Sequence, residues 1–250
     1  MAKKSNFQRN GRLRLEPLEP RRLLAVVTSA EDSGLGTLRF ALETGDPIVT
    51  FDVDAMGTPN IFLESELRID RPVIIDGEQN NITIFGSEST RCMNVLDPAG
   101  GDFPVEMRNM TMSRCRSTEG FGGAIRNEAK LTLENMSFLS NSAISGGGLM
   151  TTGPTTILSS RFAENETFQG EGGGLLIATD SKDVGIFQSE FDRNRASRGG
   201  GIFIAGTDGN NVVILDSKVT NNVATDFNGG GIFMAASAGN VTNISDSTIA

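Results

Sequence analysis

The second half of the chain is built from short apolar segments that recur at a nearly constant spacing. One apolar residue anchors each of five copies: Met112, Phe138, Phe162, Phe191 and Val219. These anchors are 26, 24, 29 and 28 residues apart. Each is followed three positions later by Asn, or by Cys in the first copy, and then by a glycine cluster and a short apolar run. A further step of 30 residues leads to Ile249, so the sequence stops inside another copy. A repeat of this length predicts a solenoid.

Apolar and polar side chains alternate on both sides of each glycine cluster. The alternating apolar pairs include Val105/Met107, Leu131/Leu133, Val184/Ile186, Leu175/Ile177 and Ile202/Ile204. A spacing of two is typical of strands, and the helical spacing of other solenoid repeats is missing. About three short strands separated by sharp turns are therefore expected in each repeat. The pattern predicts an all-β fold, a right-handed parallel β-helix whose turns lie ~4.8 Å apart and stack equivalent residues into one core.

Two shorter regions are expected before the β-helix. Residues 1–25 are basic and polar and contain two prolines near their end, which predicts a disordered leading segment. Residues 26–46 contain Leu38, Ala41 and Leu42 at helical spacing. They predict a short amphipathic helix that caps the open end of the solenoid, where strand edges would otherwise be unpaired.

The β-helix itself is expected over residues 47–250, with repeats that are clearest from residue 105. Its earlier turns are predicted from five strand-like runs, at residues 48–51, 61–63, 67–69, 73–77 and 82–86. The last predicted turn is truncated at residue 250.

The composition and the charge exclude several kinds of function. The chain has no His, so it lacks Ser-His-Asp triads, histidine metal sites and imidazole acid–base chemistry. The net charge is −9, and residues 1–24 hold seven Lys and Arg against two Glu, which leaves −14 for the remainder. An acidic body disfavours nucleic-acid and anionic-membrane partners. No apolar run approaches the ~18 residues of a transmembrane helix.

Two short N-terminal motifs resemble segments of exported bacterial proteins. The order Leu-Glu-Pro-Arg-Arg-Leu-Leu over residues 18–24 resembles the LEPR-XLL segment of large exported proteins in planctomycete-type bacteria, and the resemblance implies a role in export or surface sorting. Residues 27–43 are similar to the CSLREA-type segment that precedes β-helices in bacterial surface proteins. That second resemblance implies an N-terminal cap.

The repeats from Val105 onward also resemble a known family. A Phe-x-x-Asn followed by Gly-Gly-Ala/Gly-Ile is the hallmark of the polymorphic outer-membrane protein repeats of chlamydiae, and the likeness covers about 145 residues. One departure is that Cys115 stands where the other copies have Asn. The resemblance implies a surface-exposed β-helix of the pectin lyase-like type.

The Asn and Gly residues of the repeat are interpreted as structural. Asn tolerates the left-handed backbone of a sharp corner, and stacked amides satisfy one another, so a ladder is expected along Asn141, Asn165, Asn194 and Asn222. The glycine clusters lack the Lys-Ser/Thr of a phosphate-binding loop and open no helix. They are expected to supply backbone conformations that a Cβ would forbid.

Two pairs of residues are candidates for further chemistry. Asp216 and Asp246 hold the same position in successive repeats, so their carboxylates would lie ~4.8 Å apart and could share a Ca²⁺.

Cys92 and Cys115 are 23 residues apart, close to one turn. Both a disulfide and two unpaired buried thiols fit this spacing. The thiols are favoured, because one turn along the chain does not guarantee that the residues stack.

These observations predict a non-catalytic, exported rod at the cell surface, associated with the outer membrane or extracellular. Its expected partners are an extracellular glycan, a surface protein or matrix material, with no catalytic residues and no cofactor other than Ca²⁺ at Asp216 and Asp246. The alternative function is a Ca²⁺-dependent polysaccharide lyase or hydrolase on the same fold. A purely structural surface material would need only the same stiff rod, and neither the ligand, the anchor nor the oligomeric state follows from the sequence.

Overall fold

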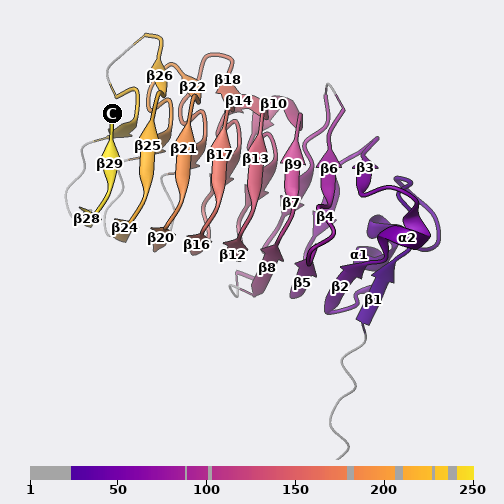
Figure 1. The fold of residues 1–250 in the computed structure, drawn as a ribbon. Coiled ribbons are helices and arrows are strands. Elements are labelled where there is room, and N and C mark those ends of the chain that lie inside the picture. Colours follow the sequence, from indigo (N-terminus) through magenta and orange to yellow (C-terminus); the bar gives the residue numbers. More distant parts are fainter. Residues whose placement is uncertain are drawn as a thin grey trace, which may run out of the picture.

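The computed structural model describes residues 24–87, 89–100, 103–178, 183–205, 211–226, 229–235 and 241–250. The predicted leading segment therefore lies outside the described residues, except for its last two positions. From Leu24 onward the chain forms a parallel β-helix whose turns follow one another along one axis (Figure 1). The prediction of an all-β parallel solenoid is confirmed.

Four sheets, here called A to D, form the described β-helix; sheets A to C extend along most of its length, and sheet D is confined to the later turns. Sheet A contains β1 (Leu24–Val27), β2 (Ile48–Phe51), β5 (Val73–Asp76), β8 (Pro104–Arg108), β12 (Lys130–Glu134), β16 (Thr155–Leu158), β20 (Val184–Phe187), β24 (Asn211–Leu215) and β28 (Val241–Ser245). Sheet B contains β3 (Asn60–Phe62), β6 (Thr83–Phe85), β9 (Thr111–Ser113), β13 (Ser137–Leu139), β17 (Arg161–Ala163), β21 (Glu190–Asp192), β25 (Lys218–Thr220) and β29 (Thr248–Ile249).

The other two sheets are shorter. Sheet C contains β4 (Leu67–Ile69), β7 (Met93–Val95), β11 (Ile125–Asn127), β15 (Leu149–Thr151), β19 (Leu175–Ile177), β23 (Ile202–Ile204) and β27 (Ile232–Met234). Sheet D contains β10 (Arg116–Phe121), β14 (Ser142–Ser145), β18 (Glu166–Thr167), β22 (Arg195–Ala196) and β26 (Val223–Ala224). Neighbouring strands are parallel in every sheet, and equivalent repeat positions pair with each other.

The expectation of three strands per turn is wrong from β10 onward, where sheet D adds a fourth. Most of its strands are so short that only one side chain of each points into the core. These side chains are Ala143, Thr167 and Ala196, all nearly inaccessible to solvent. A single small residue per turn gives no alternation that could be recognised in the sequence.

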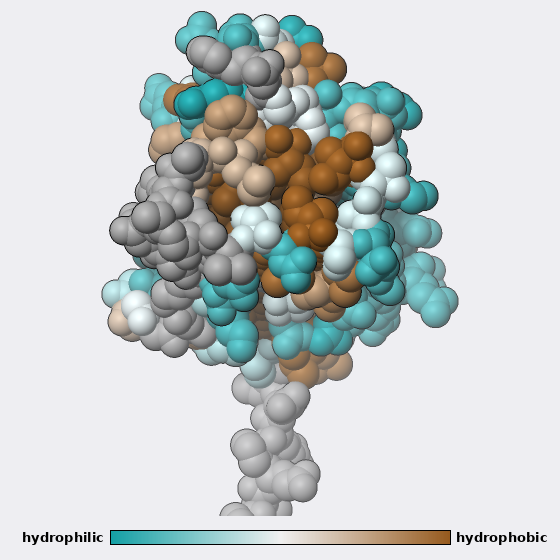
Figure 2. Space-filling model, turned by 90° about the vertical axis from the view of Figure 1, so that its left-hand side faces the viewer, coloured by the Kyte–Doolittle hydropathy of each residue, from teal (hydrophilic) through white to brown (hydrophobic). Residues whose placement is uncertain are grey.

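The anchor residues of the repeat form one buried column. Phe138 pairs with Phe162, Phe162 with Phe191, and Phe191 with Val219 in sheet B, and all four side chains are fully buried. The three rings stack with centroids 4.4 and 4.7 Å apart. The apolar columns reach the last turn, where hydrophobic side chains fill the middle of the cross-section seen end-on (Figure 2).

The predicted cap helix is present as α1 (Leu38–Thr44). Its buried face consists of Leu38, Ala41 and Leu42. Thr37 is the N-cap residue, and its side chain accepts a hydrogen bond from the Phe40 amide. It lies against the first strands of sheets A and C (Figure 1). A second helix, α2 (Val53–Met56), was not predicted, because one turn is too short to show helical periodicity.

One boundary and one backbone assignment need correction. Leu24 and Ala25 were assigned to the leading segment, but they belong to β1, which pairs with β2 in sheet A. The ladder asparagines are not themselves in the left-handed region; at this corner the left-handed residue is the one before each ladder position: Arg114, Ser140, Glu164, Arg193 and Asn221. The ladder side chains point into the core, so the residue before each of them has to turn the chain.

Candidate functional site

The asparagine ladder is a continuous chain of buried hydrogen bonds. The Asn141 amide side chain donates to Asn165 Oδ1 at 2.9 Å, Asn165 donates to Asn194 at 2.9 Å, and Asn194 donates to Asn222 at 2.9 Å. Each Oδ1 also accepts from the backbone N–H one turn earlier, and the first of these donors is Cys115 at 2.9 Å. Every polar atom of the inner members is satisfied, so the ladder is structural.

The glycine clusters lie beside the ladder at positions of close backbone contact. A Cβ on Gly148 would approach the Gly174 carbonyl oxygen to 2.6 Å, and one on Gly174 would approach Gly201 O to 2.7 Å. Real Cβ atoms essentially never approach another non-bonded heavy atom to less than 3.0 Å, so both distances exclude a side chain at these positions. These glycines therefore allow the turns to stack, as expected, and their amides point to the neighbouring turn.

Asp216 and Asp246 occupy the same corner in successive turns, directly after β24 and β28. Both are exposed and both have a left-handed backbone, with φ of 52° and 48°. Two carboxylates offer at most four oxygens, whereas Ca²⁺ takes six to eight, so most ligands would have to be water. Among the described residues no group of three or more acidic, His or Cys side chains is arranged to hold a metal ion.

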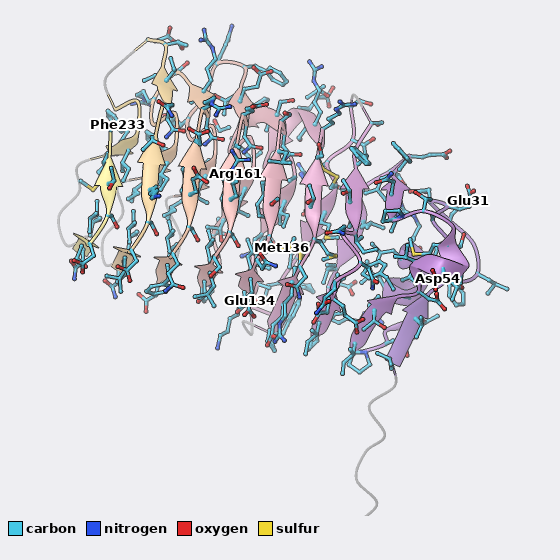
Figure 3. The ribbon with its side chains drawn as sticks, in the orientation of Figure 1. Glu31, Asp54, Glu134, Met136, Arg161 and Phe233 are labelled. Atoms are coloured by element: carbon cyan, nitrogen blue, oxygen red, sulfur yellow. A yellow bond between two sulfur atoms is a disulfide. The ribbon has the colours of Figure 1, made fainter. Side chains whose placement is uncertain are left out.

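The outer face of sheet B carries a row of charged side chains that includes Arg161 (Figure 3) and one buried carboxylate, that of Asp192. Arg161 pairs with Glu190 at 3.3 Å and lies 3.6 Å from Asp192. The Asp192 side chain is only 5 % exposed, and it also accepts from Asn221 at 2.8 Å and pairs with Arg193 at 3.2 Å. The ion pair of Arg161 with Glu190 therefore joins the neighbouring strands β17 and β21. Asp192 was not predicted, because it follows an apolar anchor and sits where other turns have Ser, Leu or Ala.

Sheet A carries a similar pair on its outer face. Arg108 of β8 pairs with Glu106 and lies 3.6 Å from Glu134. The hydrogen bond to Glu106 raises the pKa of the Arg108 guanidinium above its ordinary value. The Arg108 guanidinium therefore stays ionised at any physiological pH.

A polar pocket of about 450 Å³ lies where sheet D begins. It is lined by residues 64–66, 89–91 and 117–120, all of which are charged, hydroxyl-bearing or glycine. The earlier turns have no strand in sheet D, so the free edge of β10 faces this space. The pairing of β10 with β14 is interrupted between Ser117 and Phe121, where β10 has two more residues than its partner.

Arg91 forms the floor of the pocket and joins its walls. Its Nη1 donates to Glu66 Oε2 at 2.7 Å and its Nη2 to Ser117 Oγ at 3.1 Å. The Nε donates to the carbonyl oxygens of Phe121 at 3.2 Å and Gly122 at 3.0 Å. The Arg91 side chain is 13 % exposed, so a nearly buried guanidinium fixes the relative positions of all three lining segments.

A disulfide and a second arginine hold the same walls from behind. Cys92 and Cys115, both fully buried, are bonded to each other, with 5.4 Å between their Cα atoms. The expectation of two unpaired thiols is wrong, because these residues stack in adjacent turns. Arg39 of α1 donates to the carbonyl oxygens of Ser65 at 2.8 Å and Glu66 at 3.0 Å, and so ties the cap to the pocket.

Sequence reasoning did not find this pocket, although a signal was present. Cys115 replaces Asn in the first repeat, and the segment after it, residues 116–121, has no counterpart of equal length in the later copies. The departure from the repeat coincides with the place where the fourth sheet starts. An irregular copy in an otherwise regular repeat therefore indicates where the solenoid departs from its regular surface.

No protein-family model, curated protein or solved structure matches this chain. In the part of the chain that the structure describes, no helix is long and apolar enough to cross a membrane.

Proposed function

We propose that this chain is a non-catalytic, exported β-helix rod that binds glycans or matrix material at the cell surface. The observation that carries the proposal is the solvent-open polar pocket beside rows of outer side chains held in register by four parallel sheets. A rod of stacked turns provides a rigid, extended surface at little entropic cost to binding. The acidic body favours extracellular partners over nucleic acid.

A binding assay combined with a turnover assay tests this proposal. We expect the purified chain to bind members of a panel of bacterial and plant polysaccharides without shortening them, because the chain has no His or Tyr and the arginine that lines the polar pocket, Arg91, already pairs with Glu66. Binding is measured on immobilised polysaccharides, and turnover as release of unsaturated sugar ends in the presence of Ca²⁺. Release that is lost on Asp216→Asn or Asp246→Asn would replace the proposal with the lyase alternative.

The export part of the proposal is tested by a deletion. Removal of residues 2–23 is expected to abolish surface delivery in the native host while leaving the melting temperature unchanged. The deletion stops at residue 23 because β1, which begins at Leu24, pairs with β2. Surface delivery is measured by protease treatment of intact cells. Wild-type delivery of the shortened protein would refute a sorting role for the segment.

A further inference from the structure

The pocket at the β10 edge presents hydrogen-bonding side chains that the protein itself does not use. Five of its lining side chains are exposed and have no hydrogen-bond or ion-pair partner among the described residues: Glu64, Ser65, Ser89, Thr118 and Glu119. Three hydroxyls and two carboxylates therefore face the space. Small-molecule pockets of 300–1,000 Å³ are usually lined by apolar residues with a few polar groups, whereas every residue that lines this one is polar or glycine. Such a lining matches a ligand that is itself covered with hydroxyl groups.

The charge of the pocket restricts the ligand further. Glu64, Glu66 and Glu119 bring three carboxylates, and the single guanidinium of Arg91 already pairs with Glu66 at 2.7 Å. An acidic sugar would meet unpaired negative charge with no free cation to balance it, which disfavours binding. A neutral sugar can donate hydroxyls to the carboxylates, and an amino sugar can add a charge-assisted hydrogen bond.

The pocket is held in shape before any ligand enters. Arg91 joins the three walls, the Cys92–Cys115 disulfide lies directly behind two of them, and Arg39 holds the carbonyl groups of the third. Rigid walls reduce the ordering cost of binding, so weak polar contacts add up to a measurable affinity. The same rigidity distinguishes this pocket from the solvated charged rows on sheets A and B.

Two other occupants fit the geometry less well. A metal ion would need converging acidic ligands, and no such group exists among the described residues. An added peptide strand would need the edge of β10, but Arg91 Nε occupies the Phe121 and Gly122 carbonyls and the Arg116 amide donates to Thr90 O at 2.9 Å. With these groups occupied and the strand bulged, the edge offers no regular ladder.

We infer that this pocket binds a saccharide chain that carries free hydroxyl groups and no acidic groups. The inference rests on the proposed function, to which it adds the class of glycan and the place where it binds. Phe121, which follows the lining residues directly and is 45 % exposed, provides an apolar ring for a sugar unit beyond the pocket.

Calorimetric titration of the whole chain tests the inference with four probes. Tetramers of N-acetylglucosamine and of glucosamine are expected to bind, and a tetramer of galacturonate is not. Tetralysine carries positive charge without hydroxyls, so we expect it to bind at least about tenfold more weakly than the glucosamine tetramer. Equal binding of galacturonate or tetralysine would overturn the assigned ligand class.

Two variants and a matched control place the binding in the pocket. Ser89→Trp puts a large ring at an exposed lining position and is expected to weaken saccharide binding at least about tenfold. Ser245→Trp makes the same change at an exposed position of β28, at the far end of the rod, and is expected to leave binding unchanged. Glu119→Gln removes one of the two unpartnered carboxylates and is expected to reduce the preference for glucosamine while preserving binding of the neutral tetramer.

The failures of this inference and of the proposed function are distinguishable. Saccharide binding that survives Ser89→Trp would overturn the pocket assignment and leave a glycan-binding rod. If the wild-type chain binds neither these tetramers nor any polysaccharide of the wider panel, the glycan-binding function itself fails.

Discussion

Replacing Phe162 with alanine is expected to lower the free energy of unfolding by about 3–5 kcal/mol. The ring is fully buried and stacks between Phe138 and Phe191, with centroids 4.4 and 4.7 Å away. The strands above and below are held by parallel hydrogen bonds to their neighbours, so they cannot close the gap that the missing ring leaves. The loss therefore includes both the buried apolar surface and the cavity.

Urea denaturation followed by circular dichroism measures this effect, and the chain offers a matched control. Phe62 also stacks on a phenylalanine of the next turn, Phe85, with centroids 4.9 Å apart, but its side chain is 63 % exposed. Phe62→Ala is expected to cost less than about 1 kcal/mol, since little surface leaves the core. Equal losses in the two variants would mean that the inner column does not carry the stability.

Replacing Asn165 with alanine is expected to cost about 3 kcal/mol, because the change strands several buried groups at once. Asn165 Oδ1 accepts from both the backbone and the side chain of Asn141, at 3.0 and 2.9 Å. Its Nδ2 donates to Phe138 O at 3.0 Å and to Asn194 Oδ1 at 2.9 Å. Alanine leaves all four partner atoms without this hydrogen bond, in a place that water does not reach.

The control for the ladder is an asparagine of the same solenoid with an exposed side chain. Asn211 begins β24 and is exposed, so Asn211→Ala is expected to change the denaturation midpoint little. Hydrogen exchange of the Asn141 amide gives a second measurement, because its acceptor is lost only in the Asn165 variant. Unchanged stability and unchanged exchange at Asn141 would refute the ladder as a source of stability.

Apart from the cap helix, the correct sequence predictions concern residues that repeat. In a parallel solenoid, equal positions in successive turns pair with one another, so a period in the sequence becomes a column in space. Phe138, Phe162 and Phe191 could therefore be assigned to one buried column, and Asn141, Asn165 and Asn194 to one ladder. The helix that contains Leu38, Ala41 and Leu42 could also be predicted, because its buried face places apolar residues three and four positions apart.

Apart from sheet D, the missed features combine residues that do not repeat. Arg91 contacts Glu66 and Ser117, which are 25 and 26 residues away in the sequence. The combination of these three residues is not repeated in the other turns. Cys92 and Cys115 pair because they fall in adjacent turns, which a spacing of 23 residues allows without requiring. The short strands of sheet D were hidden for another reason, since one inward residue shows no alternation.

The sequence by itself thus determined the class of fold, the inward columns and the cap, because these depend on a period that is local to each turn. Only the tertiary structure decided which irregular turn opens a pocket, which cysteines pair and which arginine joins the walls. These features depend on which residues of neighbouring turns come to lie opposite each other. That alignment depends on all the loop lengths and contacts together, and no short stretch of residues encodes it.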